Sequence, residues 1–346
     1  MPDFRARPYC RGMSTNADGA RAPERLTDTH AERFATMVST LRTNIATVIK
    51  GKTAVIDLAL VCFFAEGHLL VEDVPGVGKT LLARALAASV DASWHRVQFT
   101  PDLLPSDVTG VTIYHQATMR FEFHPGPVFG NIVLADEINR ASPRTQSALL
   151  EVMEERQVTV DGVSHGVPRP FMVVATQNPI DMDGTYPLPE AQLDRFLART
   201  AMGYPDHDAE LDILLGQQDA GPQDRIRPVL SLGDAAAMVA AVHRVRASPE
   251  VCDYLVRLVA STRRLPEVSL PVSPRGSVSL LRAARSRALT LGRTFVTPDD
   301  IKVLAAPVLA HRLVLTAEAA LAGQTPEAVL ERAIGAVAVP HDRQTA

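Results

Sequence analysis

A nine-residue segment between an apolar strand and a helix constrains the fold of this chain more than any other feature. Residues 72–80 are Glu-Asp-Val-Pro-Gly-Val-Gly-Lys-Thr, preceded by an apolar run at residues 68–71 and followed by a predicted helix at residues 81–89. In this context, glycines let successive backbone N–H groups turn around an anion, and the helix N-terminus adds partial positive charge. The sequence therefore predicts a phosphate-binding loop.

The side chains of this loop have distinct expected contacts. Lys79 supplies a point charge for the terminal phosphates of a nucleotide, and the Thr80 hydroxyl can ligate Mg²⁺. The strict motif has glycine at position 73, whereas this chain has Asp73, at a position that closes the turn rather than touching phosphate. The alternative, a glycine-rich turn without a ligand, is much the weaker interpretation. The predicted nucleotide-binding segment comprises Asp73, Val74, Pro75, Gly76, Val77, Gly78, Lys79, Thr80 and Leu81.

A second apolar strand ends in two carboxylates. Residues 132–135 are Ile-Val-Leu-Ala, and Asp136 and Glu137 follow them. Apolar strands of this kind are buried in parallel α/β sheets, with functional residues at their carboxyl ends. Asp136 is predicted to bind nucleotide-associated Mg²⁺ and Glu137 to polarise the attacking water, since phosphoryl transfer depends on positioning and charge stabilisation. A strand ending in a solvated acid pair is the alternative, and the phosphate loop weakens it.

A third strand is predicted over residues 171–176, and it is followed by Gln177, Asn178 and Pro179. Asn178 could hydrogen-bond the nucleophilic water or the γ-phosphate. An asparagine that forms a turn before proline is the other interpretation, and the residue taken alone favours it.

Together these segments resemble the AAA+ ATPases, and in detail the MoxR family. The resemblance covers about residues 30–335, and the phosphate loop of the family also carries the aspartate found at position 73. It implies an α/β fold, with a P-loop core made of a parallel sheet flanked by helices and two β-hairpin insertions, followed by a small all-α lid domain. The matching stretches are residues 100–107 (TPDLLPSD), 136–141 (DEINRA), 178–179 (NP) and 184–196 (GTYPLPEAQLDRF).

The resemblance also implies roles for two arginines. Arg195 resembles the arginine finger that reaches the γ-phosphate of a neighbouring subunit, where such a cation can be worth ~10³–10⁵ in rate. Arg275 resembles the sensor arginine of the lid, which contacts nucleotide within its own subunit. Residues 273–275 (Ser-Pro-Arg) place a cation in the first turn of a helix, where the helix dipole prefers an acid, and a bound anion such as ATP would make this cation tolerable. Residues 142–144 have the same pattern, so this argument for Arg275 is only suggestive. From pattern alone, a solvated or ion-paired surface arginine is the favoured alternative for both.

Composition argues against several classes of protein. A net charge of −4 gives no long-range attraction for nucleic acid. Three cysteines, at positions 10, 62 and 252, indicate a reducing interior and share no metal-ligand spacing. The longest apolar stretch, residues 54–65, is interrupted by Asp57 and is shorter than the ~20 residues of a membrane span. With no signal-peptide pattern at the N-terminus, we expect a cytoplasmic protein.

Four regions are predicted along the chain: a disordered tail at residues 1–29, the α/β core at 30–204, the helical lid at 205–336 and a C-terminal tail at 337–346. In the core, apolar residues at helical spacing predict a helix over residues 34–49, and residues 53–65 predict another. Short strands are predicted at residues 97–99 and 198–202. Residues 111–123, which turn back at 124–127, and residues 157–163 are the two predicted hairpins.

The resemblance implies an ATPase that converts ATP to ADP and phosphate and drives chaperone-like remodelling, maturation or cofactor insertion in client protein complexes. It implies a homo-oligomeric ring, with a hexamer as the expected form, and a partner bearing a von Willebrand factor A domain. Three alternatives stay open: a magnesium-chelatase-type motor subunit, a nucleic-acid-directed motor, and a nucleotide-dependent switch with negligible turnover. Glu137 and Arg195 argue against the switch, because both serve hydrolysis.

Overall fold

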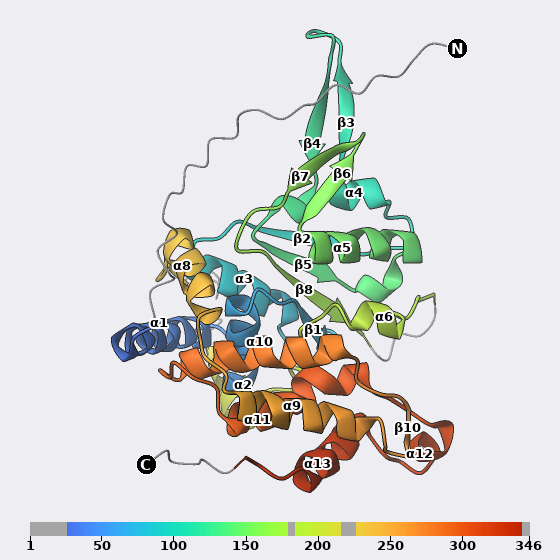
Figure 1. The fold of residues 1–346 in the computed structure, drawn as a ribbon. Helices are drawn as coiled ribbons and strands as arrows, with labels where there is room; N and C mark the ends of the chain where they lie inside the picture. Colours follow the sequence, from blue (N-terminus) through green and yellow to red (C-terminus); the bar gives the residue numbers. More distant parts are fainter. Residues whose placement is uncertain (1–25, 179–183, 216–225, 341–346) are drawn as a thin grey trace, which may run out of the picture.

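The protein is built around a five-stranded parallel sheet (Figure 1). In the computed structural model, which describes residues 26–178, 184–215 and 226–340, the strand order is β2-β5-β8-β1-β9, and neighbouring strands are parallel. All carboxyl ends therefore lie along one side of the sheet, the carboxyl edge, and all amino ends along the other, the amino edge. The strands are β1 (Leu69–Glu72), β2 (Trp94–Gln98), β5 (Ile132–Asp136), β8 (Met172–Gln177) and β9 (Ala198–Thr200).

Side chains of these strands alternate between two hydrophobic cores, one on each face of the sheet. Leu69 and Val71 pack on one face, while Leu70 between them packs on the other. Burial of both faces explains why the central strands β1, β5 and β8 are mainly apolar runs, and the predicted sheet flanked by helices is confirmed. The first face is covered by α1 (Asp28–Ala46), α2 (Thr53–Phe64) and α3 (Lys79–Ser89), and the second by α4 (Pro105–Thr109) and α5 (Pro143–Glu155).

In Figure 1, the C-terminal helices from residue 249 onward form a layer below the sheet. Proline occupies the first position of four of its helices, where its missing N–H costs nothing, as the Ser/Thr-Pro pairs indicate. The strands β10 (Val268–Leu270) and β11 (Val314–Leu315) form a short antiparallel pair. The prediction of an all-helical lid missed this pair, because strands of two or three residues are too short to show an alternating pattern of apolar and polar residues. The helices of the C-terminal part are α7 (His207–Leu215), α8 (Leu232–Val242), α9 (Pro249–Thr262), α10 (Pro274–Thr290), α11 (Pro298–Leu309), α12 (Ala317–Leu321) and α13 (Pro326–Ala336).

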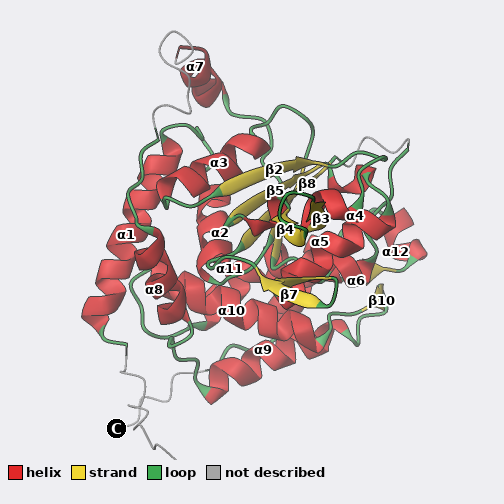
Figure 2. Ribbon diagram, turned by 90° about the horizontal axis from the view of Figure 1, so that it is seen from above, coloured by secondary structure: helices red, strands yellow, loops and turns green. Residues whose placement is uncertain are grey.

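The lid helices and the sheet share one hydrophobic core. Leu280 of α10 and Leu304 of α11 belong to the same buried cluster as Leu60 of α2 and Val71 of β1. Figure 2, viewed from above, shows α1, α8, α9 and α10 arranged around the sheet. The lid is therefore packed against the α/β core, and this packing fixes where its polar side chains lie.

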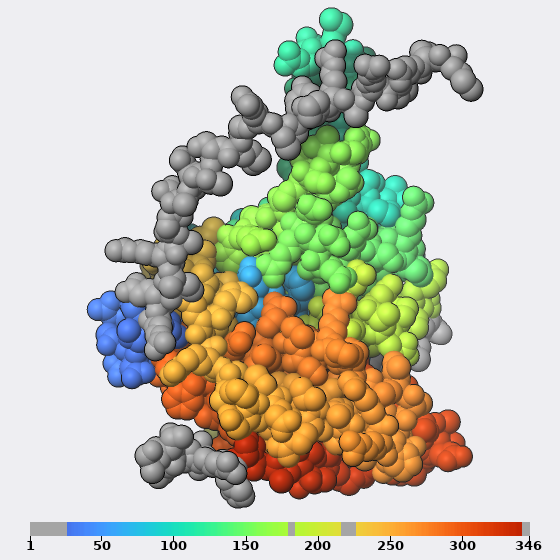
Figure 3. Space-filling view, in the orientation of Figure 1, coloured from blue at the N-terminus to red at the C-terminus, as the bar shows by residue number. Residues whose placement is uncertain are grey.

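Two β-hairpins extend from the second face of the sheet, as predicted. The β3 (Gly110–His115) and β4 (Arg120–Pro125) hairpin projects from the body at the top of Figure 3, and β6 (Gln157–Val160) pairs with β7 (Val163–Gly166) below it. The turn of the first hairpin lies at residues 116–119, so the predicted turn at 124–127 is wrong: His124 and Pro125 end strand β4, and Pro127 begins a 3-10 helix. Of the two phenylalanines on β4, Phe123 stacks on His165 of β7, whereas Phe121 is 74% exposed.

Several boundaries differ from the sequence prediction. α1 begins at Asp28, inside the predicted N-terminal tail, and ends at Ala46, so Val48 and Ile49 lie in the following loop and not in the helix. Residues 1–25 and 341–346, which hold most of the two predicted tails, lie outside the described residues. Within the described part of the chain, no helix is long and apolar enough to cross a membrane.

Candidate functional site

The predicted phosphate loop connects β1 to α3 at the carboxyl edge. Gly76 (φ +86°) and Gly78 (φ +95°) adopt a left-handed backbone conformation that favours glycine. A side chain at Gly76 would meet no atom within 4 Å, so the space above the loop is open to a ligand. α3 begins at Lys79, two residues earlier than predicted, which places the helix N-terminus at the loop. Backbone amides can therefore surround an anion here.

The structure explains the aspartate that replaces glycine in the motif. One oxygen of the Asp73 carboxylate accepts a hydrogen bond from the N–H of Val74 (2.7 Å), and the other accepts one from the N–H of Gly203 (2.5 Å). Asp73 therefore ties the loop to the segment after β9. Lys79 Nζ donates to the main-chain oxygen of Asp73 at 2.6 Å. Burial lowers the pKa of Lys79, and the carboxylates of Asp136, Asp73 and Glu137 oppose that shift.

The carboxylate of Asp136, at the end of β5, is held by two neighbouring strands. The Thr176 hydroxyl on β8 donates to its Oδ1 (2.5 Å), and Arg96 on β2 donates to its Oδ2 through Nε (3.0 Å) and Nη2 (2.8 Å). Sequence analysis missed Arg96 because the predicted strand began at residue 97, whereas β2 begins at Trp94. Both N–H groups meet the same carboxylate oxygen, and this charge-assisted pair brings a cation directly beside the acidic strand end.

Glu137 leaves the strand in a left-handed conformation (φ +56°) that is uncommon for a residue with a side chain. Its N–H donates to the Thr176 hydroxyl (2.9 Å). Its Oε2 accepts hydrogen bonds from Gln98 Nε2 (2.8 Å) and Arg140 Nη1 (3.1 Å). The carboxylate that was predicted to polarise water is thus fixed by a strand residue and by an arginine in the following turn.

These groups meet in one cavity of about 390 Å³. The structure therefore brings together the predicted residues of three separate strands, including Asn178. Thr80 and Asp136 both line this cavity, and their hydroxyl and carboxylate oxygens are donors that suit Mg²⁺, which commonly binds one or two carboxylates together with substrate phosphates. The cavity is lined by Pro75, Gly76, Gly78, Lys79, Thr80, Leu81, Arg96, Asp136, Glu137 and Asn178.

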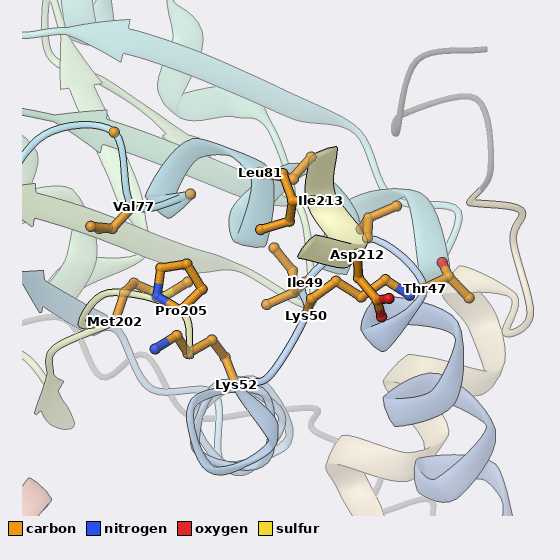
Figure 4. A pocket seen from close by; sticks show the side chains of 13 residues that line it. Thr47, Ile49, Lys50, Lys52, Val77, Leu81, Met202, Pro205, Asp212 and Ile213 are labelled. Carbon is orange, nitrogen blue, oxygen red and sulfur yellow. The ribbon is translucent and has the colours of Figure 1, made fainter. Parts of the chain in front are cut away.

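A second cavity, of about 230 Å³, adjoins the first and shares Gly76, Gly78 and Leu81 with it. Figure 4 shows Ile49, Met202 and Ile213 among its lining side chains. An apolar recess beside a phosphate loop can hold the base of a nucleotide. Sequence analysis missed it, because its walls come from segments far apart in the chain and Ile49 was assigned to the core face of a helix.

Arg195 lies at the opposite side of the sheet from this site. It follows α6 (Glu190–Leu193) and precedes β9, and the Leu197 N–H donates to the carbonyl of His68, just before β1 (2.8 Å). Because β1 and β9 are parallel, Arg195 lies at the amino edge, whereas the loop after β1 lies at the carboxyl edge. Its Nε pairs with Glu154 Oε2 of α5 at 3.2 Å.

Arg275, predicted to contact nucleotide within its own subunit, does not line either cavity at the carboxyl edge. Its Nη2 pairs with Glu154 Oε1 at 3.1 Å and its Nε lies 3.9 Å from Asp194 Oδ2, so it lies beside Arg195. The prediction of a contact within the subunit is therefore corrected. The physical reason is tertiary: α10 packs under the sheet with its first turn against the amino edge, and both arginines line a cavity of about 170 Å³ there.

A buried arginine of the lid fixes the segment that carries Arg195. Arg312 follows α11 in a short 3-10 turn, and its side chain is 2% exposed. Its Nε donates to Asp194 Oδ1 (2.6 Å) and its Nη2 to the carbonyl of Phe196 (2.6 Å). Burial lowers the pKa of Arg312, and Asp194 opposes that shift. Both neighbours of Arg195 are thus bound by the lid.

Comparisons with known proteins agree with a core of the AAA type followed by a lid. Residues 68–198 match the model of the ATPase family associated with various cellular activities (AAA), and residues 260–333 match an AAA lid domain. The chain is 52% identical to protein YeaC of Bacillus subtilis, over 87% of this chain and 94% of that protein. It is 42% identical to Chaperone MoxR1 of Mycobacterium tuberculosis, over 90% of this chain and 85% of the relative.

A solved structure of an ATPase candidate from Cytophaga hutchinsonii has the same fold. It superposes with a TM-score of 0.84 at 35% identity, covering 90% of this chain and 97% of that one. The predicted P-loop core with two hairpins and a lid is thereby confirmed, and so is the ATPase activity that the motifs indicated. The chain belongs to the MoxR family of AAA+ ATPases, and it hydrolyses ATP.

Proposed function

We propose that each ATP site of this protein is completed between two subunits. One observation carries the proposal: the phosphate loop and the acidic strand end lie at the carboxyl edge of the sheet, whereas Arg195 lies at the amino edge of the same sheet. A single subunit cannot bring these groups to one phosphate. Two copies arranged head to tail can, and repetition of that contact closes a ring. We take a hexamer as its expected form.

Within one subunit, the carboxyl edge holds the nucleotide. The loop amides and Lys79 bind the phosphates, and the apolar recess around Ile49 and Met202 takes the base. Thr80 and Asp136 would hold Mg²⁺, which neutralises charge on the phosphates when bound. Glu137 then orients and polarises the attacking water.

Asn178 lies in the same cavity and hydrogen-bonds that water or the γ-phosphate. The neighbouring subunit supplies positive charge. Arg195 approaches the γ-phosphate across the interface and stabilises the charge that develops on it during transfer, an effect worth ~10³–10⁵ in rate for such arginines. Arg275 reaches the same phosphate from the same neighbour, because it shares the Glu154 carboxylate with Arg195.

We further propose that hydrolysis drives chaperone-like remodelling, maturation or cofactor insertion in a client protein complex. Its partner carries a von Willebrand factor A domain, and no nucleic acid takes part. Membership of the MoxR family, with a relative named as a chaperone, supports this function. Exposed Tyr114 and Phe121 on the projecting β3–β4 hairpin offer an apolar contact for the client.

Mixing two inactive variants tests the shared site. Lys79→Ala removes phosphate binding but leaves the amino edge intact, and Arg195→Ala does the reverse. Each alone is expected to lose ATPase activity, while an equimolar mixture regains part of it, measured as phosphate release at saturating ATP. As a matched control, a mixture of Lys79→Ala with Glu137→Gln should stay inactive, since both lesions lie at the carboxyl edge. Absence of recovery in the first mixture would refute the shared site.

A further inference from the structure

Glu154 is the acidic group that links the two arginines of the amino edge. Its two carboxylate oxygens are divided between them: Oε2 pairs with Arg195 Nε at 3.2 Å and Oε1 with Arg275 Nη2 at 3.1 Å. One guanidinium comes from the α/β core and the other from the first turn of lid helix α10. A single carboxylate therefore sets the spacing between a core cation and a lid cation.

The other acids that line this cavity already have arginine partners. Glu66 is bound by Arg156, and Asp194 is bound by Arg312. Asp194 is also 3.9 Å from Arg275, a longer separation than either pair made by Glu154. Without Glu154, the guanidinium of Arg195 would therefore lose the ion pair that holds it, and two like charges would face each other.

The position of Glu154 in its own helix is unfavourable. It is the second-last residue of α5, whose last turn contains no basic residue, and the negative end of a helix dipole disfavours an acid there. The local sequence therefore gives no reason for this carboxylate, whereas its two tertiary contacts do.

The backbone that carries Glu154 is itself fixed. The preceding carbonyl, of Met153, accepts a hydrogen bond from His68 Nε2 (3.1 Å), and His68 Nδ1 accepts one from the Val173 N–H (2.9 Å). Because the side chains of Arg195, Arg275 and Glu154 are 28%, 42% and 39% exposed, a neighbouring subunit can still approach them. The cluster retains a net positive charge, which suits an incoming phosphate.

We propose that Glu154 is a positioning residue for hydrolysis in the neighbouring subunit: it holds Arg195 and Arg275 at the spacing in which both reach one phosphate. This inference rests on the proposed shared site. It predicts that a subunit without the Glu154 carboxylate supplies Arg195 and Arg275 less effectively to its neighbour, while its own nucleotide site is unchanged.

The test uses two kinds of subunit: a donor, which supplies its amino edge to a neighbour, and an acceptor, which supplies the nucleotide site. The donor is Lys79→Ala and the acceptor is Arg195→Ala, as in the mixture described above. Adding Glu154→Gln to the donor should lower the recovered kcat about 10-fold with unchanged KM for ATP, since misplaced catalytic groups lose rate on this scale or more. Adding the same change to the acceptor should leave recovery intact. Donor Glu154→Asp should recover part of the rate, because its charge remains but its reach is shorter.

The matched control is donor Glu151→Gln, which alters a carboxylate one turn earlier on α5 and should recover fully. Equal recovery with the Glu154→Gln donor and the parental donor would overturn the inference, and so would an increase. Equal losses from donor and acceptor would show a merely structural role and also overturn it. If the parental donor itself gave no recovery, the shared site would fail first, so the two failures are distinguishable.

Discussion

The two edges of the central sheet hold different kinds of charged group, and they are built in different ways. At the carboxyl edge, backbone amides, one lysine and two carboxylates follow directly from the strand ends. At the amino edge, arginines from a connecting segment and from the lid are held by acids from a core helix and from that connecting segment. The first edge is assembled by local sequence and the second by tertiary packing. Under the proposed shared site, neither edge alone has the complete set of charges that ATP hydrolysis uses.

The largest expected effect is on the carboxyl edge, at Glu137. Glu137→Gln keeps the size of the side chain and its contacts with neighbouring donors, but it removes the negative charge that polarises water. We expect kcat to fall about 10³-fold while ATP still binds, since general-base groups contribute on this scale. Single-turnover hydrolysis and equilibrium nucleotide binding measure the two effects.

Glu122→Gln, on the exposed hairpin strand β4, is the control and should keep the parental rate. Hydrolysis by Glu137→Gln at the parental rate would show that another group activates the water. That role at the carboxyl edge would then have to be assigned to a different residue.

An intermediate effect is expected on the amino edge, where Asp194 neutralises the buried Arg312. Asp194→Asn leaves that guanidinium with carbonyl acceptors but without a counter-ion, and we expect the free energy of unfolding to fall by about 3 kcal/mol. Urea denaturation measures it. The control is Asp253→Asn, which breaks an exposed pair with Arg257 and should cost less than about 0.5 kcal/mol. Equal small losses would mean that Arg312 does not hold this edge.

The smallest expected effect is a pH dependence from His68, which joins the amino edge to α5. Burial lowers the pKa of His68 to about 3 from 6.5, so the folded state favours the neutral ring. The unfolded chain takes up a proton below pH 6.5, and stability is therefore lost as pH falls from 6.5 towards 3, at about 1.4 kcal/mol per pH unit.

Urea melts between pH 7.5 and 4.5 should show a shallower pH dependence for His68→Gln than for the parent. Replacement of the exposed His207 by Gln should leave the slope unchanged. A parental slope in His68→Gln would place the acid sensitivity elsewhere, and the buried His311, whose pKa is also lowered by burial, would be the next residue to test.

Sequence patterns predicted the carboxyl edge well, since its groups occupy fixed positions after apolar strands. The strand, loop and helix around Lys79 have the predicted order, and the two acids lie at the carboxyl end of β5, as predicted. Arg96 and Gln98 were missed, although polar residues two apart on a strand share one face, and here that face meets the acidic strand end. The register of β2 against β5, which brings Gln98 opposite Asp136, is a tertiary fact.

By itself, the sequence determined the phosphate loop, the acidic strand end and the alternation of core and helical lid, because each depends on residues adjacent in the chain. Only the tertiary structure decided that Arg275 lies beside Arg195, that Glu154 holds both, and that Ile49 lines a recess and not a helix face. The reason is physical. Hydrophobic burial fixes how the lid packs on the sheet, and that packing sets which distant charges meet.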